Sequence, residues 1–294
     1  MDNILVSIHC ATYNHEKYIA DAIDSFLMQK TNFKFEILIH DDASTDRTAD
    51  IIREYEKRYP DLIKPIYQTV NQHSIGRSIS KINLERAQGK YIAICEGDDY
   101  WIDPYKLQKQ ADYFEGHPEC SLCIHGGYKV NASDKYIISN YRAHKSNKNF
   151  TTEEIIRRGG GLFLTNSMFY PLKYINNRPN FFNNAPVGDY PLTIYLSLLG
   201  TVHYMDEYMS AYRIAVSNSW TTRNTSTIGK KIKHNFEIAA MLDEINEYTL
   251  GKFEKVIKQT KNKNQFKIYV NQYCPVVKRF AKLAKRSWHK WAMR

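Results

Sequence analysis

The chain has no long apolar run and few cysteines. None of its 294 residues belongs to a stretch that approaches the roughly 18–20 uninterrupted apolar residues of a membrane-spanning helix. Met1-Asp2-Asn3 leads straight into an apolar segment and lacks the basic start of a secretory signal. The five cysteines are few and odd in number, which is typical of reduced thiols. These absences predict a cytoplasmic protein without a disulfide framework.

Two nucleotide-binding motifs and a zinc motif are also missing. The sequence contains neither G-x-G-x-x-G nor the phosphate-cradling G-x-x-x-x-G-K-[ST]. Cys120 and Cys123 form a C-x-x-C, but on a strand they would point to opposite faces, and no second pair exists. Zinc is therefore not expected. Any bound nucleotide must be held by acids and a metal rather than by a glycine cradle.

The composition describes a globular protein with an excess of positive charge. A hydrophobic fraction of 43% is enough for a core, and the length fits one large domain or a domain with an extension. The formal charge of +10 suggests an anionic partner. Nucleic acid, an anionic membrane and phosphorylated substrates all remain open on charge alone.

Strand-like and helix-like segments alternate through the first half of the chain. The expected strands are 4–10, 35–39, 63–67, 91–95 and 121–130. Helical periods lie between them, at 15–30, 48–59, around 84–87 and at 104–115. This alternation predicts an α/β fold, a mostly parallel sheet with helices on both faces.

The pattern changes after about residue 131. An exposed strand is expected at 136–141, a helix opened by the capping-box pair Thr151 and Glu154, and a helix from Asp189 to Leu199. The segments 202–205 and 208–214 predict a hairpin, and the chain from Ile228 onward is helical and basic. Arg213 comes directly after Ser210-Ala211-Tyr212 in the second of these segments, where it could touch a diphosphate or an acceptor, or be an exposed hairpin arginine.

Acids gather directly after the apolar run from Tyr91 to Cys95. Glu96, Asp98 and Asp99 are three acids within four residues. At the carboxyl edge of an open α/β sheet, such crowded carboxylates are tolerable around a divalent cation, which usually completes its shell with substrate phosphates. The stretch also fits an acidic loop before a helix that starts at Asp103-Pro104, so both interpretations stand at this point.

Four segments in order resemble the inverting nucleotide-sugar glycosyltransferases of family 2, which have the GT-A fold. Val6-Ser7-Ile8 through Asn14 is similar to the first strand and its nucleotide loop, and Phe35 through Asp46 to the second strand and its D-D-G-S-T-D element. Ala87 through Asp99 is similar to the approach to the D-x-D metal motif, and Gly188-Asp189 through Gly200 to the helix that carries the base. The resemblance covers roughly residues 4–220.

The resemblance implies a donor site. Ala11, Tyr13 and Asp42 would surround the nucleotide base and ribose, Asp42 as an acceptor for a base N–H. Asp98 would hold the ribose or the water shell of the metal, and Asp99 would ligate the Mn²⁺ or Mg²⁺ that bridges the two phosphates. The donor would be a nucleotide sugar, and the acceptor a carbohydrate or a lipid-linked precursor of a surface polysaccharide.

The resemblance also assigns a base and a division of the chain. Asp189 would be the general base, although taken alone it is an ordinary helix N-cap. The expected arrangement is a GT-A, Rossmann-like domain over 1–225, with a nucleotide half at 1–130 and an acceptor half at 131–225. A helical, basic extension at 226–294 would follow it.

The sequence departs from the family pattern at three points. Ala43 replaces the glycine of D-D-G-S, and Glu96 stands where the first acid of D-x-D is usual. The Q-x-x-R-W motif of processive polysaccharide synthases is missing. A transferase that adds a single sugar is therefore expected rather than a polymerase.

The last 19 residues carry a basic and aromatic pattern. Apolar residues recur at helical spacing between 276 and 291 and include Trp288 and Trp291. Seven Lys and Arg fill other positions of 276–294, which contains no acid. This pattern is typical of a helix lying in an anionic membrane surface, although a solvated helix packed on the domain would also fit. We expect peripheral contact with the inner face of the cell membrane.

Two other functions are compatible with parts of this sequence. A nucleotidyltransferase on a similar sheet would show a glycine-rich, basic loop after the first strand, and residues 11–16 are neither. A non-catalytic protein that binds nucleic acid through its basic residues 276–294 would fit the net charge. It would leave the acids Glu96, Asp98 and Asp99 unexplained, so no nucleic-acid partner is expected.

Overall fold

The computed structural model describes residues 3–175, 178–214, 216 and 226–273. The chain divides into two compact units. The first comprises 1–155, 159–178 and 192–216, and the second comprises 156–158, 179–191 and 217–294. The division at residue 225 remains a prediction, as does the division of the larger domain into two halves.

The first half of the sequence alternates strands and helices, as predicted. In chain order these are β1 (Ile4–Thr12), α1 (Ile19–Leu27), β2 (Lys34–Asp41), α2 (Thr48–Arg58), β3 (Ile63–Tyr67), α3 (Ile79–Leu84), β4 (Tyr91–Ile94), β5 (Tyr100–Trp101), α4 (Lys106–Gly116) and β6 (Cys120–Asn131). The elements that follow are β7 (Ile137–Tyr141), β8 (Lys148–Phe150), α5 (Thr152–Arg158), β9 (Phe169–Pro171), α6 (Asp189–Leu199) and β10 (Thr201–Ile214). The expected capping box is present, because the Thr151 and Glu154 side chains each accept a bond from the other's backbone amide at the start of α5.

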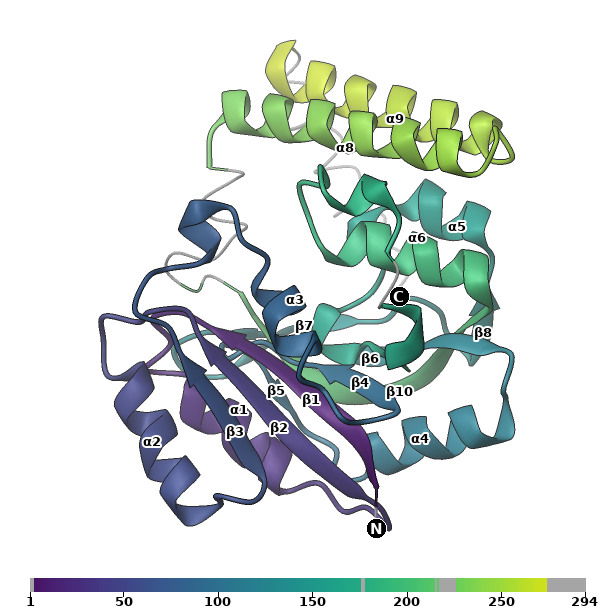
Figure 1. Cartoon of the computed structure of the whole chain (residues 1–294). Helices are drawn as coiled ribbons and strands as arrows, with labels where there is room; N and C mark the ends of the chain where they lie inside the picture. Colours follow the sequence, from purple (N-terminus) through teal and green to yellow (C-terminus); the bar gives the residue numbers. More distant parts are fainter. Residues whose placement is uncertain (1–2, 176–177, 215, 217–225, 274–294) are drawn as a thin grey trace, which may run out of the picture. The chain divides into compact units, whose positions relative to one another are not determined.

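The strands form one mixed sheet. In the part of the chain that the structure describes it has ten strands, ordered β3-β2-β1-β4-β9-β6-β10-β5, with β7 on β6 and β8 on β10. The run β3-β2-β1-β4 is parallel, as are β6 and β10, whereas β9 is antiparallel to both of its neighbours. The predicted α/β fold is confirmed. Figure 1 shows α1 and α2 on one side of the sheet and α3 on the other.

The two faces of β1 are buried for different reasons. Ile8 and Cys10 belong to the apolar core, which also includes Ile23 and Phe26 of α1. The alternating residues Ser7 and His9 are polar and point to the opposite face, where Asn83 Nδ2 of α3 lies 2.8 Å from His9 Nδ1. There the Ser7 hydroxyl donates to Glu36 Oε1 at 2.6 Å. Alternation along one strand thus separates an apolar layer from a hydrogen-bonded polar layer.

The hairpin expected after residue 201 is wrong. Residues 201–214 form the single strand β10, which runs parallel to β6 with irregular register between Met205 and Tyr208 and again before Ser210. The segment between the two predicted strands, Asp206-Glu207, lacks the glycine that two-residue hairpin turns favour. The chain therefore continues through an irregular stretch, where Asp206 accepts from Arg142 Nε at 2.6 Å.

The second unit contains the two long helices α8 (Ile228–Tyr248) and α9 (Glu254–Tyr273). Met241, Leu242 and Ile245 are its buried residues on α8, and Val256 and Ile257 are buried on α9. In the described ranges, no helix is both long enough and apolar enough to cross a membrane. The basic pattern at 276–294 lies outside the described residues.

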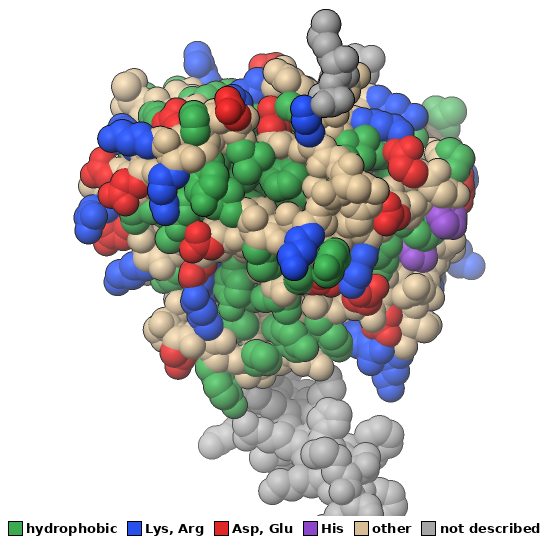
Figure 2. Space-filling view, turned by 90° about the horizontal axis from the view of Figure 1, so that it is seen from below, with side chains coloured by type: hydrophobic (Ala, Val, Ile, Leu, Met, Phe, Trp, Pro, Cys, Tyr) green, Lys and Arg blue, Asp and Glu red, His purple; other side chains and the backbone are tan. Residues whose placement is uncertain are grey.

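Charged and apolar side chains share the surface. On the face drawn in Figure 2, hydrophobic side chains gather toward the middle, and Lys and Arg side chains are interspersed with Asp and Glu around them. That face therefore carries charges of both signs rather than one basic field.

Candidate active site

Three turns meet at the carboxyl edge of the parallel strands. They follow β1, β2 and β4, which are neighbours in the sheet. The amide of Gly97 donates to the carbonyl of Ala11 at 2.9 Å, and that of Asp42 donates to the carbonyl of Thr12 at 3.0 Å. The predicted residues Ala11, Tyr13, Asp42, Asp98 and Asp99 are thereby brought to one edge, where α/β sheets bind ligands.

The turns after β1 and β2 are joined by reciprocal hydrogen bonds. The Asn14 amide donates to Ser44 Oγ at 2.9 Å, and the Thr45 amide donates to Asn14 Oδ1 at 2.8 Å. Asn14 and Ala43 have φ of 55° and 62°, in the left-handed region that glycine favours. The two turns form one connected rim, with the 37% exposed side chain of Tyr13 beside it.

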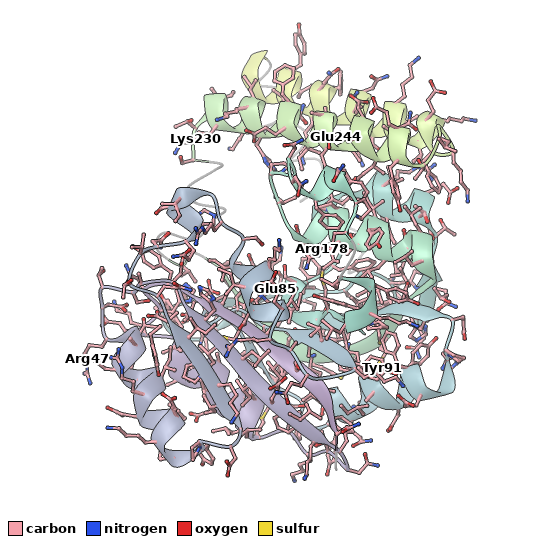
Figure 3. The ribbon with its side chains drawn as sticks, viewed as in Figure 1. Arg47, Glu85, Tyr91, Arg178, Lys230 and Glu244 are labelled. Atoms are coloured by element: carbon pink, nitrogen blue, oxygen red, sulfur yellow. The ribbon has the colours of Figure 1, made fainter. Side chains whose placement is uncertain are left out.

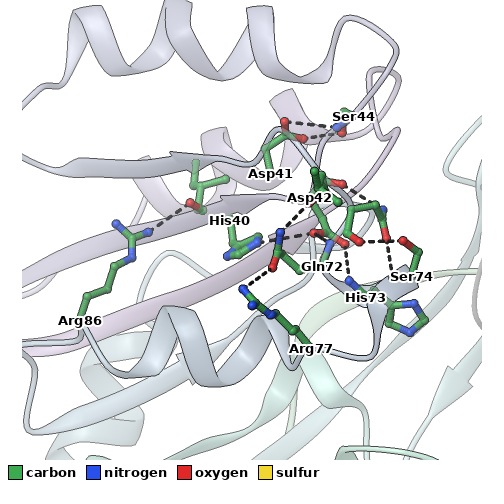
Figure 4. A network of polar contacts seen from close by, with 12 residues as sticks. His40, Asp41, Asp42, Ser44, Gln72, His73, Ser74, Arg77 and Arg86 are labelled. Carbon is green, nitrogen blue, oxygen red and sulfur yellow. Dashed lines mark hydrogen bonds and ion pairs between the residues drawn. The ribbon is translucent and has the colours of Figure 1, made fainter.

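Asp42 holds the loop that follows β3 (Figure 4). Its side chain accepts from the backbone amide of Gln72 at 2.6 Å and from that of His73 at 3.1 Å. The residue is 1% exposed. His40 Nε2 lies 3.8 Å from Asp42 Oδ1, and burial lowers the pKa of that imidazole. The role of Asp42 toward a nucleotide base stays a prediction, since two of its acceptor sites are already used.

Asp98 and Asp99 have different surroundings. Asp99 is 1% exposed, and its two oxygens accept from the Arg213 amide at 2.8 Å and from Asn166 Nδ2 at 3.0 Å. Burial, followed by the charges of Asp98 and Glu96, raises the pKa of the Asp99 carboxyl well above its usual value. The Asp98 side chain is 20% exposed, with Oδ2 3.9 Å from His15 Nε2. Asp98 therefore presents the more accessible carboxylate of the pair.

The turn that carries Glu96, Asp98 and Asp99, here called the acid turn, fits a cation whose coordination shell substrate phosphates would complete. Within the described ranges, no group of three or more His, Cys, Asp and Glu is placed to hold a metal by itself. A cation such as Mg²⁺ often needs only one or two carboxylates when phosphates supply other ligands. Three buried polar atoms near this turn, all on described residues, have no hydrogen-bond partner: Thr12 Oγ1, His15 Nδ1 and Arg213 Nε. These unused atoms fit a polar ligand beside Asp98.

Arg213 is a site residue that sequence reasoning left undecided. The alternative of an exposed hairpin arginine is wrong, because Arg213 ends the buried part of β10 and is 3% exposed. Its Nη1 donates to the carbonyl of Asp98 at 2.7 Å, and its Nη2 donates to Asp21. Asn166, which binds Asp99, carries no motif that could have identified it from the sequence.

Asp189 is the first residue of α6 and belongs to the second unit. Its side chain is half-buried, and Oδ1 accepts from the amide of Tyr190 at 2.8 Å. Burial raises the pKa of the Asp189 carboxyl above its ordinary value of 3.8. The carboxyl at the start of α6 is thus a stronger base than that of a solvated aspartate.

A pocket of about 500 Å³ lies elsewhere on the first unit. It is lined by residues around the beginning of β4, including Lys90, Tyr91 and Glu115. Figure 3 labels Tyr91, which starts the strand that ends before the acid turn. The pocket contains none of the predicted site residues.

This arrangement defines a class of protein. The parallel run of the mixed sheet places an accessible carboxylate and unused polar groups at its carboxyl edge, as nucleotide-binding α/β proteins do. The chain belongs to glycosyl transferase family 2, because the model of that family matches residues 7–176, more than half of the chain. The resemblance noted on the sequence is thereby confirmed.

Curated relatives share part of their length with this chain. An uncharacterized protein of Mycobacterium tuberculosis is 36% identical over 225 residues, which are 75% of this chain but only 62% of the relative. A putative teichuronic acid biosynthesis glycosyltransferase of Bacillus subtilis, TuaG, is 37% identical over 131 residues, 44% of this chain and 49% of TuaG. The match therefore spans less than two thirds of either relative.

Solved structures share the fold. TarS 1–349 of S. aureus, in complex with UDP-GlcNAc, has a TM-score of 0.59 at 17% identity. The match covers 83% of this chain and 67% of the TarS chain. The mannosyltransferase PcManGT of Pyrobaculum calidifontis, in complex with GDP-Man and Mn²⁺, has a TM-score of 0.56 at 14% identity. The match covers 98% of this chain and 83% of the PcManGT chain. At these identities the likeness establishes the GT-A-like fold.

Proposed function

We propose that this protein is an inverting glycosyltransferase that moves one sugar from a nucleotide-diphosphate sugar to an acceptor hydroxyl. The observation that carries the proposal is the accessible Asp98 carboxylate, in a turn at the sheet edge of a family 2 chain. The nucleotide sugars bound to TarS and PcManGT support the choice of donor.

Asp98 and Asp99 are the residues that would hold Mn²⁺ or Mg²⁺. Asp98 is the more exposed of the two, and each Asp99 oxygen accepts one hydrogen bond and keeps a second lone pair, so we assign both carboxylates to the cation. When bound, the cation supplies Lewis-acid stabilisation of the leaving diphosphate. Ala11, Tyr13 and Asp42 would line the space for the base and ribose.

Asp189 would remove the proton from the acceptor hydroxyl. The acceptor oxygen bonds to the anomeric carbon while the bond from that carbon to the phosphate oxygen breaks, and the proton passes to the Asp189 carboxylate. A single displacement inverts the anomeric centre. A base of this kind contributes about 10²–10⁴-fold. We expect Asp189→Asn to lose turnover by this factor and to keep donor binding.

The raised pKa of Asp189 predicts the pH dependence of turnover. The base acts only when deprotonated, so kcat should fall as pH decreases through a pKa that lies above 3.8. Substantial turnover by Asp189→Asn, or an unchanged acid limb in that variant, would remove this assignment.

The proposal is tested by calorimetry with a panel of nucleotide sugars, with and without Mn²⁺. Metal-dependent binding of one donor that is lost in Asp98→Ala would support both the donor class and the cation site. Asp112→Ala is the matched control, because Asp112 is an exposed carboxylate on α4 outside the site. Failure of the wild type to bind any nucleotide sugar in the presence of metal would contradict the proposal.

We also propose that the acceptor is a lipid-linked or surface-polysaccharide precursor. TuaG, a relative named for teichuronic acid biosynthesis, supports this class of acceptor. Transfer of labelled sugar to a membrane lipid extract, dependent on Asp189, is the expected result. Transfer only to soluble small molecules would contradict it.

Peripheral contact with the cytoplasmic face of a membrane completes the proposal. Support comes from the seven cationic residues and two tryptophans of 276–294, and from the exposed lysines of α8 and α9 that precede them.

A further inference from the structure

Arg213 contacts the acid turn through its backbone and its side chain. Its amide donates to Asp99 Oδ1 at 2.8 Å, and its Nη1 donates to the carbonyl of Asp98 at 2.7 Å. The Asp98 peptide group and the Asp99 side chain are therefore both fixed by one residue of β10. Because Asp98 carries the accessible carboxylate, a contact that fixes the Asp98 peptide group also restricts the position of that carboxylate.

The guanidinium is itself held from three directions. Its Nη2 pairs with Asp21 of α1, and the rings of Tyr18 and Tyr100 lie with their centroids 5.1 Å and 4.6 Å from Cζ. Asp21 also pairs with Lys135 Nζ at 2.7 Å, in the turn between β6 and β7. The arginine thus connects α1, the acid turn and β10 within the first unit.

These contacts require the shape of arginine as well as its charge. The planar guanidinium donates to the Asp98 carbonyl through Nη1 and to Asp21 through Nη2, while its face stacks on tyrosine rings. Lysine would keep the charge at a single point and could not make both bonds in this geometry. The substitution Arg213→Lys therefore separates the positioning geometry from the electrostatic charge.

We propose that Arg213 is a positioning residue that fixes the Asp98 carboxylate for the cation and diphosphate, acting through the Asp98 carbonyl and the Asp99 carboxylate. The inference rests on the proposed function of this turn and deepens it. Arg213→Lys should weaken the metal-dependent part of nucleotide binding, because outer contacts that orient a ligand typically contribute 10–100-fold to metal affinity.

The test uses the full chain with UDP and GDP as probes, each titrated with Mn²⁺ and with EDTA. In Arg213→Lys we expect binding about 10–100-fold weaker in Mn²⁺ and unchanged in EDTA. Asp21→Asn, which removes the charged partner but leaves the bond to Asp98, should weaken binding less. The matched control is Arg142→Lys, because Arg142 forms a similar fork with Asp206 at the surface, and it should bind as the wild type does.

Hydrogen–deuterium exchange of residues 96–101 is the second measurement, and it needs no ligand. Arg213→Lys should accelerate exchange there and leave residues 34–41 of β2 unchanged. Wild-type affinity in Arg213→Lys, or an equal loss with Mn²⁺ and EDTA, would overturn the positioning role. If the wild type binds neither nucleotide, the proposed function fails. In that case hydrogen–deuterium exchange still tests whether Arg213 holds the acid turn. Unchanged exchange at 96–101 in Arg213→Lys would overturn the inference.

Discussion

Ala43 adopts a backbone conformation that glycine tolerates better. Its φ is 62° in the turn after β2, where the Ser44 amide donates to Asp41 Oδ2 at 3.4 Å. A non-glycine residue in this region costs about 1–3 kcal/mol, whereas glycine loses roughly 0.5–1 kcal/mol through its flexible unfolded state. We expect Ala43→Gly to raise the free energy of unfolding by about 1 kcal/mol in urea denaturation.

Ala20→Gly in α1 is the control for that substitution. Ala20 is half-buried like Ala43 but lies inside a helix, so glycine should cost about 0.5–1 kcal/mol there. Equal destabilisation by the two substitutions would show that the left-handed conformation of Ala43 carries no strain.

Lys106 is a buried lysine without a hydrogen-bond partner among the described residues. Its Nζ lies 4.0 Å from the Trp101 ring centroid, and burial lowers its pKa from 10.5 to about 7. Between these values the unfolded chain holds a proton that the folded chain lacks, so this residue makes stability rise with pH. Lys106→Met should stabilise the fold by roughly 1–3 kcal/mol near pH 7, the usual cost of an unpaired buried polar group.

The gain from Lys106→Met should shrink as pH rises from about 7 and disappear well above 10.5, where neither state is protonated. Chemical denaturation at several pH values compares this variant with Lys81→Met, whose side chain is 73% exposed. The control should change stability by less than about 0.5 kcal/mol. A pH-independent gain would mean that packing, and not titration, is responsible.

Local sequence could identify the acids of the candidate site but not the groups that hold them. Asp42, Asp98 and Asp99 stand next to strands whose apolar pattern is visible along the chain. Asn166 and Arg213 reach Asp99 across 67 and 114 residues of sequence. No local pattern encodes such contacts, because they depend on which strands become neighbours in the sheet.

At the level of the elements, Gly89 allows the approach of α3 and β4 to β1. A Cβ at this position would lie 2.5 Å from the backbone nitrogen of Ser7 and 2.7 Å from the carbonyl carbon of Val6. Backbone of a central strand cannot move away cheaply. We expect Gly89→Ala to cost roughly 1–3 kcal/mol, or more, in thermal or urea unfolding.

Gly116, at the end of α4, is the matched control for Gly89. A Cβ there would meet nothing within 4 Å, so Gly116→Ala should be neutral or stabilise by up to about 1 kcal/mol. If Gly89→Ala behaved like Gly116→Ala, the close packing against β1 would not limit stability.

Periodicity predicted the strands of the parallel run but not the complete sheet. β1 to β4 are apolar segments bounded by turns, and their alternation with helices defines parallel neighbours. β9 has three residues and lies between β4 and β6, where it joins two parts of the sheet. Its role depends on pairing rather than on composition. The wrong hairpin at β10 has the same cause, because the parallel pairing with β6 that keeps residues 201–214 in one strand is not visible in the local sequence.

For the whole molecule, the distribution of charge predicts where an anionic partner binds better than the total charge does. Seven of the Lys and Arg residues lie in 276–294, which leaves only a small excess of positive charge for the rest of the chain. The mixed charges on the face in Figure 2 agree with this distribution. An interaction driven by charge should therefore depend more on the last 19 residues than on residues 1–275.

Deleting 276–294 should abolish binding to vesicles that contain anionic lipid, because each basic residue near such a surface contributes about 1 kcal/mol. The truncation leaves α9, which ends at Tyr273, intact. The control Trp288→Ser/Trp291→Ser retains all seven charges and should bind more weakly but with the same salt dependence. Vesicle sedimentation at increasing salt gives both quantities. Unchanged sedimentation of the truncated chain would show that this segment is structural, and binding of nucleic acid in place of vesicles would identify a different anionic partner.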